Sequence, residues 1–264
     1  MINFFRRIRK KLADDNKPLK YARYAIGEIL LVVVGILIAL QINNWNEQKK
    51  EEALEQEYYC RLLEDVDLDL EQINILIIES KVRLKASNQA TRLLQKPVAY
   101  KIEIGEQIGK SILSIYSDFR PNDAAFEDLK SGANINIIKD KSIIKALNYY
   151  FNKVEGYISI IKVNGENAVK IFYAHSDVFE NGWVQSSMSL TTGRFYRGMD
   201  KDLYQAVDLD KSETFSSQMQ KRLYNESLQY ISHNSRQLDL YQSIKDEIII
   251  LKSYLETKCA NTND

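Results

Sequence analysis

The longest hydrophobic pattern in the chain lies near its start. Residues 25–42 include one charged side chain, Glu28, in a run that is otherwise almost wholly apolar. An α-helix of this length covers about 27 Å, close to the hydrocarbon thickness of a bilayer. A core helix of a soluble protein would show a polar stripe, whereas residues 29–40 are apolar on all sides. The pattern therefore predicts a transmembrane helix over 21–44.

After this run, apolar residues recur every three or four positions for some 40 residues, the period of one helix face. These positions are Leu54, Tyr58, Leu62, Val66, Leu70, Ile73, Ile77 and Leu84. No Gly or Pro interrupts the pattern before Pro97, so we expect one long amphipathic helix that continues from the membrane span. The same period predicts a second long helix from about Ser212 to Lys258, with Asp210 or Ser212 as its N-cap.

Shorter helical patterns separate these two helices. One candidate helix covers 103–117. The next lies within the stretch RPNDAAFEDLKSG, where Asn122 or Asp123 is the expected N-cap. We expect Gly132 to end this helix in the left-handed conformation, which glycine adopts at little cost.

A further helical pattern covers 139–180, with Asp140 as its N-cap and Gly156 or Gly165 as a break. Residues 182–209 lack sustained periodicity and are expected to form a long loop, with a short helix or strand pair inside it as the alternative. Only 10 Gly and 3 Pro occur in the chain, which suits helices better than a many-turned β fold. The prediction is an all-α fold.

The charges around the apolar run indicate its direction. Residues 1–24 carry eight basic and two acidic side chains, and positive flanks stay on the cytoplasmic side. The remaining 28 basic and 34 acidic side chains would then be exported, and their negative balance argues against a nucleic-acid partner. We expect an elongated periplasmic helical bundle over 45–258, folded as one domain, with 259–264 as a tail.

The first 20 residues allow two interpretations. The stretch INFFRRIRKKLA combines apolar and basic positions in the manner of a helix lying on an anionic leaflet. A disordered basic tail is the alternative. No small-x-small cleavage pattern follows the apolar run, which favours an uncleaved anchor over a signal peptide.

Three stretches carry a resemblance to a known family: FFRRIRKKL, YAIGEILLVVVGILIALQINNWNE and FEDLKSGANINIIKDKSIIKALNYYF. They look like a family of uncharacterised single-span proteins of Bacteroidota, whose members open with the same anchor signature. The resemblance implies an inner-membrane anchor and a periplasmic helical domain in a Gram-negative bacterium. Because that family is a domain of unknown function, it implies no catalytic residue.

Small and polar residues within the apolar run are candidates for helix contacts. Gly27, Gly35 and Ala39 lie close to one helix face, and the last two form a small-xxx-small pattern that lets helices approach closely. We expect homo-oligomerisation through this face, the alternative being that it faces lipid; an envelope protein is the other expected partner of the chain. Glu28 would cost about 3 kcal/mol at the bilayer centre and less near the interface, so it is expected to face a partner helix, a watery cavity or the membrane surface.

The two cysteines, Cys60 and Cys259, fall in the two long helices. If the last helix runs antiparallel to the first, Cys259 returns toward Cys60, and an oxidising compartment would allow a disulfide. Two unpaired thiols are the alternative.

Candidate chemistry is sparse. The acidic run LLEDVDLDLEQ could attract calcium, but without a turn glycine it indicates a solvated helix face. His175 and His233 lack a ligand context, so no metal or cofactor is expected. Arg194 and Arg197, with Tyr196, could hold an anionic group, the alternative being an ordinary surface loop.

No Gly-x-Ser-x-Gly motif and no phosphate-binding Gly-rich loop occurs in the sequence. We therefore expect a non-enzymatic membrane protein whose periplasmic bundle senses, scaffolds or docks onto envelope partners. One alternative is a subunit of an ion-coupled or pore-forming assembly that uses Glu28. The other is a periplasmic enzyme that works from the loop at 182–209.

Overall fold

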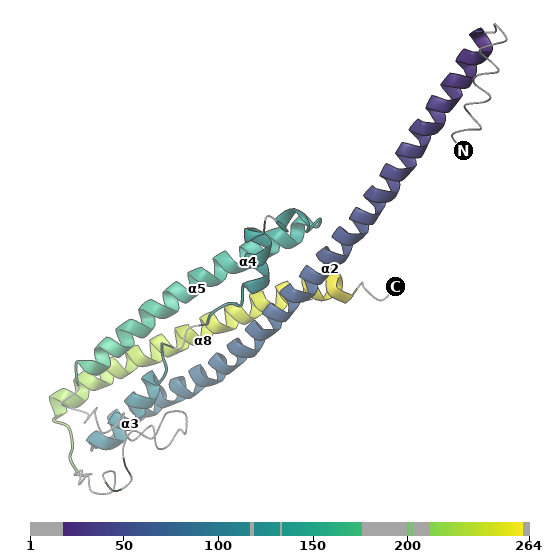
Figure 1. Cartoon of the computed structure of the whole chain (residues 1–264). Helices are drawn as coiled ribbons and strands as arrows, with labels where there is room; N and C mark the ends of the chain where they lie inside the picture. The colour runs from purple at the N-terminus through teal and green to yellow at the C-terminus, as the bar shows by residue number, and fades with distance from the viewer. Residues whose placement is uncertain are drawn as a thin grey trace. The chain divides into compact units, whose positions relative to one another are not determined.

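The computed structural model describes residues 18–116, 119–132, 134–175, 200, 202 and 212–260. Figure 1 shows the long helices of the chain. They are α2 (Pro18–Leu94), α3 (Lys101–Ile112), α4 (Ala124–Ser131), the 3-10 helix η1 (Asn134–Asn136), α5 (Lys141–Tyr173) and α8 (Ser217–Cys259). Within the described residues the one strand-like pairing is the bridge between Tyr100 and Thr214. The predicted all-α fold is confirmed.

The chain divides into two compact units, Met1–Glu57 and Tyr58–Asp264. In the first unit, α2 contains the apolar run, and it is the one helix of the described residues that is long and apolar enough to cross a membrane. Its apolar side chains are exposed: Leu31 is 71% exposed and Ile42 61% exposed. The predicted helix over this run is therefore present, with an apolar surface that water solvates poorly.

In the second unit, α2 and α8 lie side by side and antiparallel (Figure 1). Cross-links along the pair fix this register, because each advance along α2 is matched by an equal retreat along α8. The cross-linked pairs are Cys60–Cys259, Asp67–Lys252, Arg83–Gln237, Thr91–Ser227 and Gln95–Tyr224. The antiparallel arrangement of the two long helices, which the sequence analysis took as the condition for a disulfide, is present in the structure.

The apolar stripes of these helices form the core of the second unit. Five of the predicted α2 positions are buried there: Tyr58, Leu62, Val66, Ile73 and Ile77. The matching positions in α8 are Tyr241, Ile244, Ile248, Leu251 and Leu255. Full burial of such a side chain is worth roughly 1.5–3 kcal/mol, so the stripes account for the packing of the pair. A second cluster covers the far end, where residues of α3 and the end of α5 pack on α2 and α8.

Helix α5 begins as the sequence predicts but does not break. The N-cap Asp140 accepts a hydrogen bond from the backbone N–H of Ser142 at 3.0 Å. The helix then continues through both Gly156 and Gly165 to Tyr173, so the expected break is wrong. Gly165 is buried, and the carbonyl oxygen of Ile115 lies 3.3 Å from the position that a Cβ atom would take. This glycine serves close packing rather than a break.

The start of α8 also differs from the prediction. Its N-cap is Ser216, whose hydroxyl accepts a hydrogen bond from the N–H of Met219. Ser212 lies in a turn before the helix, and Asp210 falls outside the described residues. The cause is a backbone pairing with the chain before α3: the N–H of Lys101 donates to the carbonyl of Glu213, and that of Phe215 to the carbonyl of Ala99. Because residues 213–215 are extended in this pairing, the helix cannot begin at Ser212.

Two shorter helices end differently from expectation. Helix α3 ends at Ile112 rather than at 117, and Ser114 just after it has a φ of 56°. Gly132, at the end of α4, has a φ of −76° and so is not left-handed. A Cβ atom at this glycine would lie 2.7 Å from the side-chain nitrogen of Asn134 and 3.1 Å from the carbonyl oxygen of Asp128.

Candidate functional site

The acidic run of α2 is part of a binding surface for another segment of the chain. The segment 120–125, which leads into α4, lies across this face of α2. Its backbone N–H groups donate to side chains spaced one turn apart: Ala125 to Asp65 at 2.8 Å, Asn122 to Asp69 at 2.7 Å and Arg120 to Gln72 at 3.2 Å. The predicted solvated face is therefore wrong for Asp69, which is fully buried.

These contacts replace the cap that the sequence predicts for α4. The N-cap residue is Asp123, but its side chain makes no capping hydrogen bond. Asp65 accepts instead from the N–H of Ala125, in the first turn of α4, and a carboxylate at this position also favours the positive end of the helix dipole. The cap of α4 thus comes from α2, 60 residues away in the sequence.

Asp69 has an unusual environment for a carboxyl group. It accepts hydrogen bonds from the side chain of Asn122 at 2.8 Å and from the hydroxyl of Tyr150 at 2.5 Å, besides the backbone bond from Asn122. Burial raises the pKa of Asp69 to about 6, although these three hydrogen bonds oppose the rise. Burial, and then the charge of Asp69, raises the pKa of Tyr150, so this hydroxyl keeps its proton and acts as the donor.

A further contact attaches α4 to α2 closer to the start of the bundle. Asp128 of α4 accepts from the hydroxyl of Tyr58 at 3.2 Å and forms an ion pair with Arg61 at 2.9 Å. Both partners of that ion pair are partly exposed, so the pair itself contributes little. Its position still matters, because α4 is held to α2 at Ala125 in its first turn and again at Asp128, three residues later. This fixes the wall of the pocket described next.

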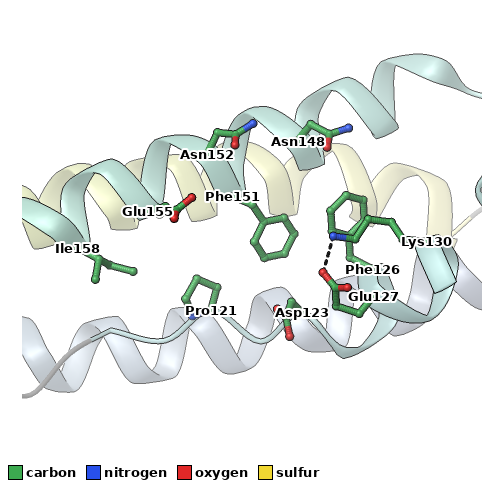
Figure 2. Close-up of a pocket in the computed structure, with 10 residues that line it drawn as sticks. All are labelled: Pro121, Asp123, Phe126, Glu127, Lys130, Asn148, Phe151, Asn152, Glu155 and Ile158. Carbon is green, nitrogen blue, oxygen red and sulfur yellow. Dashed lines mark ion pairs between the residues drawn. The ribbon is translucent and has the colours of Figure 1, made fainter.

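A pocket with a volume of about 370 Å³ lies between α4 and α5, and we name it the α4–α5 groove (Figure 2). One wall comes from α4 and the residues before it, and the other from one face of α5. The lining residues are Pro121, Asp123, Phe126, Glu127, Lys130, Asn148, Phe151, Asn152, Glu155 and Ile158. Phe126 and Phe151 stack across the groove with ring centroids 5.0 Å apart and an interplanar angle of 6°.

The charges in the groove are divided between two places. Lys130 forms an ion pair with Glu127, and its ammonium group lies 4.6 Å above the ring centroid of Phe126. Around Phe151 the charged groups are the carboxylates of Asp123 and Glu155, and neither forms an ion pair with any residue that the structure describes. The arrangement suits a ligand that brings a positive charge.

Buried polar side chains that the sequence pattern did not predict cross the bundle beyond the groove. Asn234 of α8 donates to the hydroxyl of Ser87 and to the carbonyl of Ser111, each at 2.9 Å. Gln237 follows Asn234 by three residues on α8. Its side chain accepts a hydrogen bond at 3.2 Å from Arg83, which lies one turn before Ser87 on α2. A signal was available: Arg83 and Ser87 continue the three- and four-residue spacing of the apolar stripe, so a polar side chain there must be buried and bonded.

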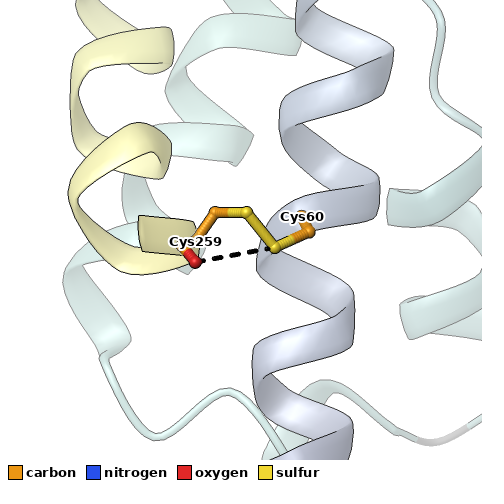
Figure 3. The surroundings of a disulfide bond; sticks show 2 residues. All are labelled: Cys60 and Cys259. Carbon is orange, nitrogen blue, oxygen red and sulfur yellow. Dashed lines mark hydrogen bonds between the residues drawn. A yellow bond between two sulfur atoms is a disulfide. The ribbon is translucent and has the colours of Figure 1, made fainter. Parts of the chain in front are cut away.

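The two cysteines are bonded in the structure (Figure 3). The sulfur atoms of Cys60 and Cys259 are 1.98 Å apart and the Cα atoms 5.0 Å apart. The bond joins the last residue of α8 to the part of α2 that begins the second unit. Of the two alternatives that the sequence allowed, the structure has the disulfide.

The histidines take different structural roles. His175, just after α5, is buried, and its Nε2 atom lies 2.6 Å from a carboxylate oxygen of Glu226 in α8. His233 is half-buried, and burial lowers its pKa. Among the residues that the structure describes, no cluster of three or more His, Cys, Asp or Glu side chains could hold a metal ion.

Other predicted site residues are not brought into a site. Gly27 and Gly35 have no side-chain or backbone neighbour within 4 Å of a built Cβ atom, so packing of this face, with Ala39, against another helix stays a prediction. Glu28 is half-buried in the first unit. The expected loop at 182–209 lies outside the described residues, except for positions 200 and 202. The candidate anion-binding residues Arg194, Tyr196 and Arg197 are therefore not described.

Comparison with known proteins gives a family but no described function. A family model, described as a family of unknown function (DUF6090), matches residues 28–180. No curated protein and no solved structure matches the chain. The matched range extends from the apolar run through α5, and so includes both walls of the α4–α5 groove.

Proposed function

This chain belongs to the family of unknown function DUF6090, and on that premise we propose that it is a single-pass inner-membrane protein of a Gram-negative bacterium. In this proposal its helical bundle lies in the periplasm and acts by binding a ligand or envelope partner, as a sensor or scaffold, without catalysis. The observation that carries the proposal is the apolar run of α2. Its side chains are exposed, and lipid solvates such a surface far better than water does.

Two independent features support the direction of the anchor. The residues before the run have a surplus of six basic side chains, which favours a cytoplasmic N-terminus. The Cys60–Cys259 bond belongs to the second unit, which follows the apolar run in the sequence. Disulfides persist in oxidising compartments such as the periplasm and are rare in the cytosol. Charge and cysteine chemistry therefore support the same orientation.

The lining of the α4–α5 groove supports binding over catalysis. Its members are aromatic rings, side-chain amides, carboxylates and a paired lysine. A few polar groups placed around an apolar floor are typical of sites that orient a ligand. The groove lies in the second unit, the part of the chain that the proposal places in the periplasm.

Cell fractionation and protease access test this proposal. The full chain is produced in a Gram-negative host, and membranes are collected and washed with alkaline carbonate. We expect the protein to stay in the membrane fraction, and protease to digest the bundle once the outer membrane alone is opened. Protection of the bundle until the inner membrane is opened would contradict the orientation, and a chain dispersed without detergent would contradict the anchor.

A matched pair of variants separates the anchor from the rest of α2. The double variant Leu31→Arg/Ile38→Arg adds two charges inside the apolar run, at a cost of roughly 2.5–3.5 kcal/mol each, and should lose its membrane association. The control, Leu68→Arg/Ile75→Arg, makes the same changes at exposed positions of α2 in the second unit. It should remain in the membrane fraction like the unaltered chain.

A further inference from the structure

We propose that the α4–α5 groove is a binding site for an organic cation: an ammonium or guanidinium group carried on an apolar stem. This goes beyond the proposed membrane topology and does not depend on it. The argument rests on the shape of the groove, on its aromatic floor and on the two carboxylates around Phe151.

The ring of Phe151 is the centre of the site. Figure 2 shows this ring between the two walls, with Asp123 on the α4 side and Glu155 on the α5 side. Glu155 follows Phe151 by four residues on α5, so the two side chains share a helix face. A cation placed beside this ring would lie near a carboxylate on either side and near a π-surface, the combination that stabilises ammonium and guanidinium groups most strongly.

The chain already uses this chemistry in the neighbouring half of the groove. Lys130 places its ammonium group over Phe126 and pairs with Glu127. Among the described residues no cation lies over the ring of Phe151 in the same way. Of the two stacked rings, Phe126 carries the chain's own lysine. Phe151, against which the ring of Tyr150 packs edge-on at 5.1 Å, lies beside carboxylates that form no ion pair with a described residue. The inferred ligand supplies the positive partner.

Size and charge narrow the ligand class further. A volume of about 370 Å³ is at the small end of ligand pockets, enough for an amine with a short apolar body or for one long side chain. Asn148 and Asn152 line the same face of α5, and their amides can accept from the N–H groups of the cation. The chain after the basic N-terminal segment is net negative, which raises the local concentration of cations and disfavours anionic ligands.

The same chemical group could come from a free amine or from a lysine or arginine side chain of an envelope protein. Titration calorimetry on the full chain in detergent distinguishes these sources with two probes. One is phenethylammonium, with 2-phenylethanol as its uncharged match. The other is acetyl-leucyl-arginyl-leucine amide, with citrulline in place of arginine as its uncharged match. Binding of either charged probe, at least tenfold tighter than its match, is the expected result.

Three variants test the location of the site. Asp123→Asn and Glu155→Gln remove the two carboxylate charges with little change in volume. Each should lower the affinity for the charged probe about threefold, as expected for exposed charges. The double variant should lower the affinity for the charged probe about tenfold. Glu166→Gln, an exposed position farther along α5, is the matched control and should bind like the unaltered chain. The two single changes should fold normally, because neither carboxylate forms a hydrogen bond or ion pair with another residue in the described part of the chain.

The outcomes are decisive in each direction. Binding of phenethylammonium alone assigns the site to free amines, and binding of the arginine peptide alone assigns it to a protein side chain. The proposal is overturned if neither charged probe binds, if the uncharged matches bind equally well, or if Asp123→Asn and Glu155→Gln behave like Glu166→Gln. A weaker affinity at higher salt is expected in addition.

Discussion

Asp69 is a carboxyl group that the fold buries among hydrogen-bond donors instead of opposite a positive charge. Its neighbours are the hydroxyl of Tyr150 and two N–H groups of Asn122. Such donors stabilise the ionised form, yet removal from water disfavours it more strongly, and the pKa rises to about 6. Asp69 therefore fixes the segment before α4 to α2 at a cost in folding free energy. Because this cost arises when the carboxyl is ionised, it depends on pH.

Replacing Asp69 with Asn should remove one part of the pH dependence of folding. Between pH 3.8 and about 6 the folded chain keeps the proton of Asp69 while the unfolded chain releases it. The contribution of Asp69 to the free energy of unfolding is thus fully present below this window and falls as pH rises through it, by roughly 3 kcal/mol. Urea unfolding of both proteins at pH 4 and pH 7 measures the difference.

Glu64→Gln provides the control, since Glu64 is an exposed carboxylate on the same acidic run of α2. Its pH dependence should follow that of the unaltered chain. If Asp69→Asn also retains the full pH dependence, the burial of this carboxyl does not control stability in that range.

At the scale of single helices, the two glycines of α5 make a matched comparison. Both lie inside the helix, where replacing Gly with Ala commonly gains up to about 1 kcal/mol. At Gly156 an added Cβ atom meets open space, so Gly156→Ala should raise the free energy of unfolding by that amount. At Gly165 it would lie 3.3 Å from the carbonyl oxygen of Ile115, in a buried contact, and Gly165→Ala should give no gain or a loss.

Thermal unfolding of both glycine variants beside the unaltered chain measures this difference. Equal stabilisation by the two changes would show that the turn after α3 shifts freely, and that close packing does not explain the glycine at 165.

Periodicity predicted the long helices well, because a stripe of apolar residues must be buried against another such stripe. The ends of the helices were predicted less well, because distant residues determine them. The N-cap position of α4 at Asp123 was expected, but the carboxylate that caps the helix is Asp65 of α2. The pairing of Glu213 with Lys101 delays α8 until Ser217. Neither contact can be found by inspecting the residues beside the helix end.

At the scale of the whole molecule, the candidate site was missed for a related reason. The groove is formed only when α4 is laid beside α5, and residues of α2 hold it there. In the sequence, the acidic run had the composition of a solvated face. The spacing did place Asp69 on the apolar stripe, three residues after Val66 and four before Ile73. The face of α5 carrying Asn148, Phe151 and Glu155 does mix amide, aromatic and acidic groups at helical spacing, a pattern that could have suggested a lined pocket.

The Cys60–Cys259 bond closes the second unit, and its removal should affect the stability of the whole bundle. The two residues are separated by 199 positions, and cross-links across such long separations restrict the unfolded chain strongly, so reduction should cost about 3–5 kcal/mol. Urea unfolding of the detergent-solubilised chain, with and without dithiothreitol, measures this loss. The double variant Cys60→Ser/Cys259→Ser should match the reduced chain and be insensitive to the reductant.

Hydrogen exchange of the reduced chain should show which part of the bundle loses stability first when the disulfide is reduced. Since Lys252 still pairs with Asp67 two turns before the end of α8, the register of α2 and α8 should survive near that pair, while protection falls first over residues 255–260. Exchange that rises equally along all of α8 would mean that the bond, rather than the buried stripe and its polar cross-links, maintains the antiparallel pair. An unchanged unfolding midpoint in chains shown by mass spectrometry to be reduced would contradict a stabilising role altogether.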